Sequence, residues 1–159
     1  RLVLGGAGIE WEEARARVNE PEMDGRLHCI PKLPFETLRK LTASADVGLS
    51  LDKGSHGNYE MSLPNKLFDF MHARLPMVVT ARKEVAAIVR EHGLGEVVEH
   101  ATPSAVKAAV DKVLQRPRAE WDEALSRASE SFHWGVDEPQ IERALDTCLK
   151  AHLAGSQTQ

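Results

Sequence analysis

Hydrophobic residues along the chain alternate between short continuous runs and longer stretches with helical spacing. The runs are mostly apolar and bounded by Gly, Pro or charged residues, and they predict strands at about 1–5, 26–30, 46–51, 76–80 and 95–98. Between the runs, apolar residues recur every three or four positions, as in helices that pack on a sheet. This alternation predicts an α/β fold with one doubly wound, Rossmann-like parallel sheet, whose ligand crevice lies at the carboxyl ends of the strands.

Local signals mark several helix boundaries. Pro34 suits the first turn of a helix that runs to about 44, Thr102 with Pro103 forms an N-cap and first-turn pair, and Gly93 is a natural C-cap. Beyond Pro117 the alternation with strands stops, and two extra C-terminal helices are expected. Their apolar positions are Trp121, Leu125, Ala128 and Phe132 on the first helix and Ile141, Leu145, Leu149 and Leu153 on the second.

The composition is that of a globular domain. The chain has 159 residues, which predicts one domain over 1–153 and a flexible tail over 154–159. A formal net charge of −4 argues against a nucleic-acid partner, and no apolar run approaches the ~20 residues of a transmembrane segment. Cys29 and Cys148 are expected to be small buried hydrophobes without a disulfide.

A glycine-rich turn, with Gly5, Gly6 and Gly8, follows the first predicted strand. Such a turn lets the backbone approach a phosphate or a sugar closely and can expose amides at a helix start. The dinucleotide-binding fingerprint needs further glycine spacing and a later acidic residue, and this sequence lacks both. A tight strand-to-helix turn without a ligand is the alternative interpretation.

The segment 62–79 carries a stronger signal. Ser62 is predicted to be the N-cap and Pro64 a first-turn residue of a helix whose amides face the crevice. Lys66 then lies in the first turn, where a cation opposes the helix dipole unless an anion is bound nearby. Asp69, one turn later, can accept hydrogen bonds from ribose hydroxyls. The alternative is an exposed ion pair between Lys66 and Asp69.

The order of these motifs resembles one family. Asp46-Val47 is similar to the family's "adv" strand start, Leu75 to Val79 is similar to its "G-x-P-V-V" segment, and Ser62 to Phe70 is similar to the variant "S-x-P-N-K-L-F-E-Y". Over about residues 1–115 the chain resembles the C-terminal, donor-binding domain of retaining GT-B glycosyltransferases of the group 1, family 4-like type. The resemblance implies a nucleoside diphosphate sugar as donor, with no other cofactor and no metal.

The resemblance also implies residue roles. Asp69 stands where the family has the glutamate that binds the donor ribose, and the backbone at Ile30 and Pro31 receives the base. The amides of Ser62 and Leu63, with Lys66, are expected near the diphosphate. The glutamate that contacts the transferred sugar would fall at Met61, with Glu60 beside it, so Glu60 and Lys66 are the candidate catalytic residues.

The resemblance implies a hexosyltransferase-like enzyme in polysaccharide or glycoconjugate synthesis. Arg1 opens directly in strand-like sequence, so the domain is expected to be incomplete at its N-terminus. The acceptor-binding domain is a missing partner, and the fragment alone is expected to be inactive. The expected location is cytoplasmic, at the inner face of the membrane if the missing domain binds there. The alternatives are a nucleotide-sugar 2-epimerase and, because of Met61, a non-catalytic nucleotide-binding or interaction module.

Overall fold

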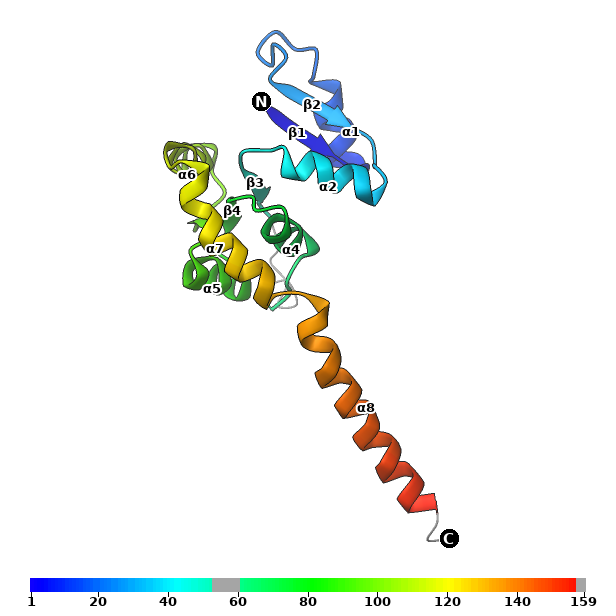
Figure 1. The fold of residues 1–159 in the computed structure, drawn as a ribbon. Coiled ribbons are helices and arrows are strands. Elements are labelled where there is room, and N and C mark those ends of the chain that lie inside the picture. The colour runs from blue at the N-terminus through cyan, green and yellow to red at the C-terminus, as the bar shows by residue number, and fades with distance from the viewer. Residues whose placement is uncertain (53–60, 157–159) are drawn as a thin grey trace. The chain divides into compact units, whose positions relative to one another are not determined.

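The computed structural model describes residues 1–52 and 61–156, with side chains to residue 150 (Figure 1). Its backbone contacts divide the chain into two compact units, residues 1–41 and residues 42–159. Strands and helices alternate through both units as far as β5. The α/β class that the sequence predicts is therefore confirmed, and all five predicted strands are present within two residues of their expected bounds.

The first unit is built on a pair of parallel strands. β1 (Leu2–Gly5) and β2 (Leu27–Ile30) pair with Leu2 opposite Leu27 and Gly5 opposite Ile30. Helix α1 (Ile9–Ala16) connects them, and α2 (Phe35–Ala43) crosses the boundary between the units. Leu27 is buried in this pair, whereas Leu2 and Val3 of β1 are exposed.

The second unit contains a three-stranded parallel sheet in the order β3-β4-β5. β4 (Met77–Thr80) lies between β3 (Gly48–Ser50) and β5 (Gly95–Val98) and is buried at every residue. The helices described in residues 61–156 of this unit are α4 (Asn65–His72), α5 (Lys83–His92), α6 (Pro103–Gln115), α7 (Arg118–Ser131) and α8 (Trp134–Ser156). The largest fully buried core side chains are Leu67, Met71, Leu75, Met77, Val78, Val79, Val89, Leu94, Val113 and Leu125.

The predicted helix ends are partly confirmed. Thr102 caps α6 by accepting a hydrogen bond from the Ala105 amide at 3.2 Å, and Gly93 ends α5 in the left-handed conformation. The prediction for α4 is wrong by two residues, since its N-cap is Pro64 and not Ser62. Pro64 has the extended conformation of an N-cap, which the proline ring allows, and its carbonyl already accepts from the Leu67 amide at 3.0 Å.

The strand pairing differs from the prediction. The sequence predicts one sheet of five strands, but the strands described here form a two-stranded sheet and a three-stranded sheet, one in each unit. Periodicity identifies a strand from its own residues, whereas pairing depends on which edges meet in space, and no local pattern encodes that. The single domain over 1–153 stays a prediction.

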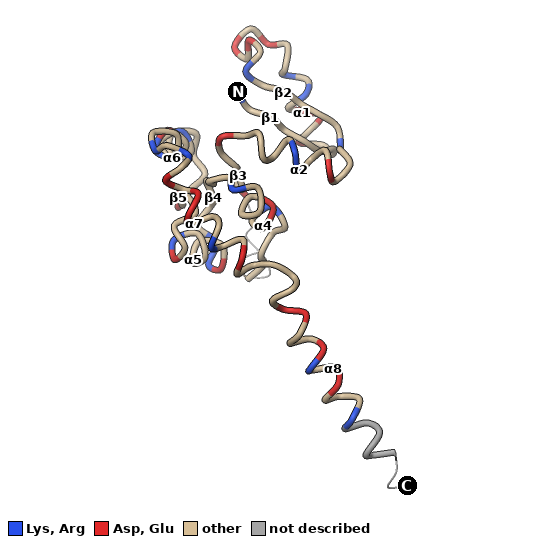
Figure 2. The backbone as a smooth tube through the Cα atoms, in the orientation of Figure 1, with Lys and Arg blue, Asp and Glu red and all other residues tan. Residues whose placement is uncertain are grey.

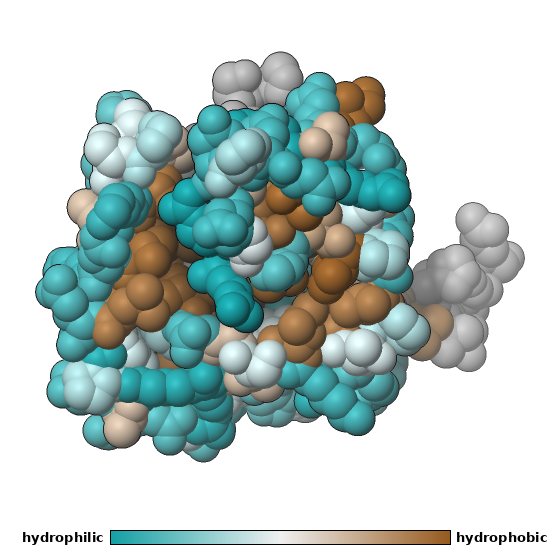
Figure 3. All heavy atoms as spheres, turned by 90° about the horizontal axis from the view of Figure 1, so that it is seen from above, coloured by the Kyte–Doolittle hydropathy of each residue, from teal (hydrophilic) through white to brown (hydrophobic). Residues whose placement is uncertain are grey.

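The surface carries mixed charge and some exposed apolar groups. Lys and Arg are interspersed with Asp and Glu along the backbone (Figure 2), and hydrophobic side chains reach the surface in several places (Figure 3).

Cys148 is exposed and Cys29 is half-buried. The prediction that both cysteines are buried is therefore wrong for Cys148, because its helix α8 has exposed side chains throughout residues 134–150. Within the described residues, no helix has the length and apolar character needed to cross a membrane.

Candidate functional site

The carboxyl ends of β3 and β4 carry a group of connected polar side chains. Lys66, in the first turn of α4, places Nζ 3.1 Å from Oδ1 of Asp52, which follows β3. Ser50 donates its hydroxyl to the other carboxylate oxygen of Asp52 at 3.0 Å, and Thr80 at the end of β4 donates to the Asp52 carbonyl at 3.2 Å. Two strands and one helix therefore meet at the Asp52 residue.

The carboxyl of Asp52 is held in its charged form. Burial raises its pKa, but the hydrogen bonds from Lys66 and Ser50 and the positive charges of Lys66 and Arg82 outweigh burial, so the pKa lies below its ordinary value. The side chain of Asp52 is 32% exposed and that of Lys66 is 48% exposed. The carboxylate is thus held by Lys66 and Ser50, while the ammonium remains accessible to solvent.

A second cation lies close to this group. Arg82 is the N-cap residue of α5 and is only 6% exposed, and its charge is among those that lower the pKa of Asp52. The ammonium of Lys66 lies in the first turn of α4, and Arg82 acts electrostatically on the same Asp52 carboxylate. Cations next to a helix N-terminus favour an anionic ligand such as a phosphate group.

Close packing sets the position of α4, and hence of Lys66. Leu67 and Met71 are completely buried on the inner side of α4. The helix approaches β3 so closely that a Cβ added at Gly48 would lie 2.6 Å from the Phe70 ring. Only glycine allows this approach without displacement of the ring, so Gly48 helps to place the first turn of α4 at the carboxyl edge of the sheet.

The structure changes the interpretation of Lys66. The sequence offered an ion pair with Asp69 as the alternative to a bound anion, but the observed ion pair is with Asp52, fourteen positions earlier. The carboxylate of Asp52 already offsets the unfavourable position of a cation in the first turn of α4. Lys66 therefore does not require a bound diphosphate to explain where it stands.

The other predicted residues of this unit are solvent-accessible. Ser62, Leu63 and Asp69 are exposed, Met61 is 60% exposed, and Glu60 lies outside the described residues. Sequence reasoning missed Ser50, Thr80 and Arg82, and gave Asp52 no individual role. A usable signal was present, because Ser50 and Thr80 end strands and Asp52 and Arg82 stand two residues beyond them, at the edge where parallel sheets bind ligands.

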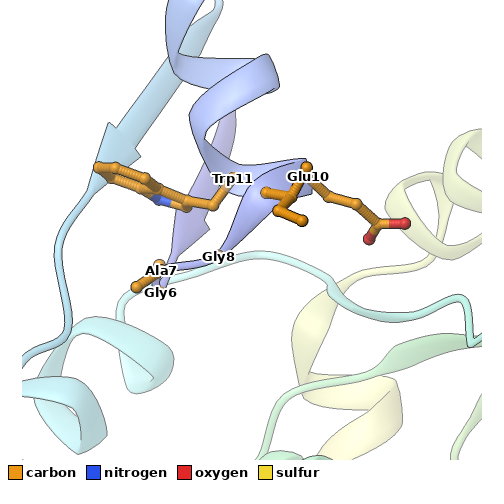
Figure 4. A pocket seen from close by; sticks show the side chains of 7 residues that line it. Gly6, Ala7, Gly8, Glu10 and Trp11 are labelled. Atoms are coloured by element: carbon orange, nitrogen blue, oxygen red, sulfur yellow. The ribbon is translucent and has the colours of Figure 1, made fainter.

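The glycine-rich turn lies at the carboxyl edge of the other sheet. The Gly6 amide donates to the Ile30 carbonyl at 3.1 Å, and Gly8, with φ of 121°, is the N-cap of α1. Residues 5–11 line a shallow hollow of about 340 Å³ (Figure 4). Trp11 fixes this turn by donating its indole N–H to the Leu4 carbonyl at 3.2 Å. The predicted residues Gly5, Gly6, Gly8 and Ile30 are thus brought together, and the exposed Pro31 directly follows Ile30.

The charge of this hollow favours one of its predicted ligands over the other. Glu10 lines the hollow and, with Glu12, makes the first turn of α1 acidic. A carboxylate at this place opposes a phosphate by Coulomb repulsion and can accept hydrogen bonds from hydroxyl groups. The turn therefore suits a sugar or another hydroxylated group better than a phosphate.

Metal coordination has no candidate in the part of the chain that the structure describes. Within residues 1–52 and 61–150, no three His, Cys, Asp or Glu side chains come close enough to hold a metal ion. The prediction that the protein needs no metal stays a prediction.

Comparisons with known proteins bear on the fold. No protein-family model matches the chain. No curated protein sequence matches it either. Among solved structures, the chain is similar to AviGT4, a glycosyltransferase involved in avilamycin A biosynthesis, with 24% identity, a TM-score of 0.66 and coverage of 89% of this chain and 41% of AviGT4. It is also similar to WaaG, a glycosyltransferase involved in lipopolysaccharide biosynthesis, with 18% identity, a TM-score of 0.64 and coverage of 87% and 36%.

These similarities confirm the predicted fold type. The chain has the Rossmann-like fold of GT-B glycosyltransferases and spans less than half the length of the two that it matches. At these identities the likeness concerns the fold alone. One fold hosts many different reactions, so the fold by itself assigns neither a reaction nor a donor to this chain.

Proposed function

We propose that the chain is the donor-binding half of a retaining glycosyltransferase that uses a nucleoside diphosphate sugar. The observation that carries the proposal is the position of Lys66 in the first turn of α4, paired with Asp52 at the carboxyl ends of β3 and β4. This is the edge at which α/β sheets bind ligands, and an ammonium at a helix N-terminus suits a diphosphate. The GT-B fold supports the same assignment.

In this proposal, the chain's contribution to the reaction is electrostatic. The bond between the anomeric carbon of the sugar and the diphosphate oxygen breaks, and negative charge develops on the diphosphate as it leaves. The ammonium of Lys66 and the amides at the start of α4 stabilise that charge in the transition state. This chain covers only 41% of AviGT4 and 36% of WaaG. In the proposal, the acceptor binds to a further domain of the kind that those two structures contain outside the matched region.

Other residues take the roles implied by the family resemblance. Asp69, exposed on α4, accepts hydrogen bonds from the ribose, and the amides of Ser62 and Leu63 contact the diphosphate. Glu60 acts at the transferred sugar. For the first unit, contacts of Gly5, Gly6, Gly8, Ile30 and Pro31 with the donor remain a prediction from the family resemblance.

One observation favours a second candidate function. Because Asp52 already neutralises Lys66, this polar group is complete without a ligand. The same fold can then serve as an interaction module that carries out no transfer. In that case nucleotides bind weakly, and substitution of Lys66 leaves their affinity unchanged.

Calorimetric titration of the whole protein with UDP, GDP and pyrophosphate tests the proposal. The variant Lys66→Met is expected to weaken binding of all three probes, because each carries a diphosphate. Asp69→Ala is expected to weaken the two nucleotides and leave pyrophosphate unchanged, because pyrophosphate has no ribose. Lys112→Met is the matched control, since Lys112 pairs with Glu96 on β5 at 2.8 Å and is assigned no ligand.

Two results would contradict the proposal. Nucleotide binding that Lys66→Met leaves unchanged moves the site away from α4. Absence of nucleotide binding in the whole protein supports the interaction module instead.

A further inference from the structure

The proposed function leaves the Asp52 carboxylate without a role. It lies 3.1 Å from the ammonium that is assigned to the diphosphate, and its other oxygen accepts from Ser50 at 3.0 Å. Its backbone carbonyl is held by Thr80 at 3.2 Å. The carboxylate is therefore a fixed part of the sheet edge, and it lies beside the site that is meant to bind an anion.

An anion at Lys66 meets two opposing effects. The ammonium attracts the diphosphate, but Asp52 repels it and already occupies one of the three N–H donors of Lys66. Lys66 has a flexible four-carbon stem and is 48% exposed, so its ammonium can turn from Asp52 towards a ligand. Asp52, held by Ser50 and Thr80, cannot follow it in the same way.

We propose that Asp52 competes with the diphosphate for Lys66, so that the nucleoside diphosphate left after sugar transfer binds less tightly and leaves the site more readily. This inference rests on the proposed function. The exchange makes and breaks no covalent bond. Lys66 is paired with Asp52 in the empty site, turns to the diphosphate when the donor binds, and returns to Asp52 as the product departs.

The isosteric variant Asp52→Asn gives the direct test in the whole protein. It keeps an acceptor for Ser50 and removes the negative charge. Pyrophosphate, UDP and GDP are each expected to bind about two- to fivefold more tightly, the range that one partly exposed ion pair supports. The gain is expected to disappear in the Lys66→Met background, because the competition acts through Lys66.

A matched control separates this effect from a general change in charge. Glu96→Gln breaks the Lys112–Glu96 ion pair, which has a similar geometry at 2.8 Å, and changes the net charge by the same amount. It is expected to leave the affinity for all three probes unchanged. An equal gain from Glu96→Gln would show that the effect of Asp52→Asn is not local.

The two proposals fail in different ways. If Lys66→Met leaves the affinities unchanged, the proposed function is wrong and this inference falls with it. If Lys66→Met weakens binding but Asp52→Asn leaves it unchanged or weakens it, the proposed function stands and the competition is overturned. A gain from Asp52→Asn that persists without Lys66 also overturns the competition.

Nuclear magnetic resonance of the wild type tests the same exchange when Asp52→Asn does not fold. Addition of pyrophosphate is expected to shift the ¹⁵Nζ signal of Lys66 and the carboxyl ¹³C signal of Asp52 together, with one common midpoint. A shift of Lys66 with no change at Asp52 overturns the proposal.

Discussion

Lys66 and Asp52 form an ion pair of 3.1 Å although they are fourteen positions apart in the sequence. The pair joins the first turn of α4 to the residue that follows β3. It explains how a cation can stand at a helix N-terminus, and it fixes the local charge at the carboxyl edge of the second unit's sheet. Both the proposed diphosphate site at Lys66 and the proposed competition by Asp52 depend on this one contact.

The pair is expected to make stability depend on pH. The folded-state pKa of Asp52 lies below the ordinary value of 3.8, so its contribution is present above pH 3.8 and is lost as the pH falls through the folded-state pKa. The contribution is at most about 1 kcal/mol, because both side chains are partly exposed and solvent screens the pair. Urea unfolding of wild type and Asp52→Asn should therefore differ at pH 5, and the difference should shrink as the pH falls below 3.8. A constant difference between them contradicts this assignment.

Gly48→Ala is expected to lower the free energy of unfolding by about 1–3 kcal/mol. The added methyl carbon would lie 2.6 Å from the Phe70 ring, which forces the ring and α4 away from β3. Gly5→Ala is the matched control, since its methyl carbon meets Ile30 at an ordinary 3.6 Å. Denaturant unfolding followed by circular dichroism measures both variants. Equal losses would show that the Gly48–Phe70 contact has no special importance.

Arg118→Lys is expected to lower the free energy of unfolding by about 1 kcal/mol. The guanidinium donates to the Ala45 carbonyl at 2.9 Å and to the Ala43 carbonyl at 3.2 Å, and a lysine cannot reproduce this fork. Arg127→Lys on the same helix is the control, because the one contact described for the Arg127 side chain within residues 1–52 and 61–150 is an exposed ion pair with Glu123. Thermal unfolding of the two variants compares them. A loss in Arg127→Lys as large as in Arg118→Lys contradicts a specific role for the fork.

Leu125→Ala is expected to lower the free energy of unfolding by about 2–5 kcal/mol, because it leaves a cavity where a fully buried side chain stood. Leu149→Ala on α8 is expected to change it by less than about 0.5 kcal/mol in the same chain, since Leu149 is 59% exposed. Calorimetry of the two variants makes the comparison. A large loss in Leu149→Ala would show that α8 packs against other parts of the chain in solution.

Local signals predicted much of the fold. The apolar runs located all five strands, because a short, mostly apolar run bounded by Gly, Pro or charged residues is a local pattern, whether the strand is buried, as β4 is, or exposed, as β1 is. Thr102 and Gly93 marked helix ends correctly, since capping depends on the side chain or the backbone freedom of one residue. The Ser62 cap failed because Pro64 can occupy the same position, and the sequence alone does not rank the two.

The candidate site was predictable only in part. The sequence singled out Lys66 because a cation is conspicuous at the start of a helix. Its partner was not predictable, because the contact with Asp52 depends on how β3, β4 and α4 meet. For Arg82 the sequence shows only its place two residues beyond β4, and its importance follows from burial at the N-cap of α5.

The sequence by itself determined the strands, most helix boundaries, the α/β class and the glycine turn, since each depends on neighbouring residues. The tertiary structure alone decided that the strands described here pair as two sheets, and that Asp52 and not Asp69 meets Lys66. The physical reason is the same in both cases. Strand pairing and long-range ion pairs depend on which surfaces are brought together by packing, and that information is spread over the whole core.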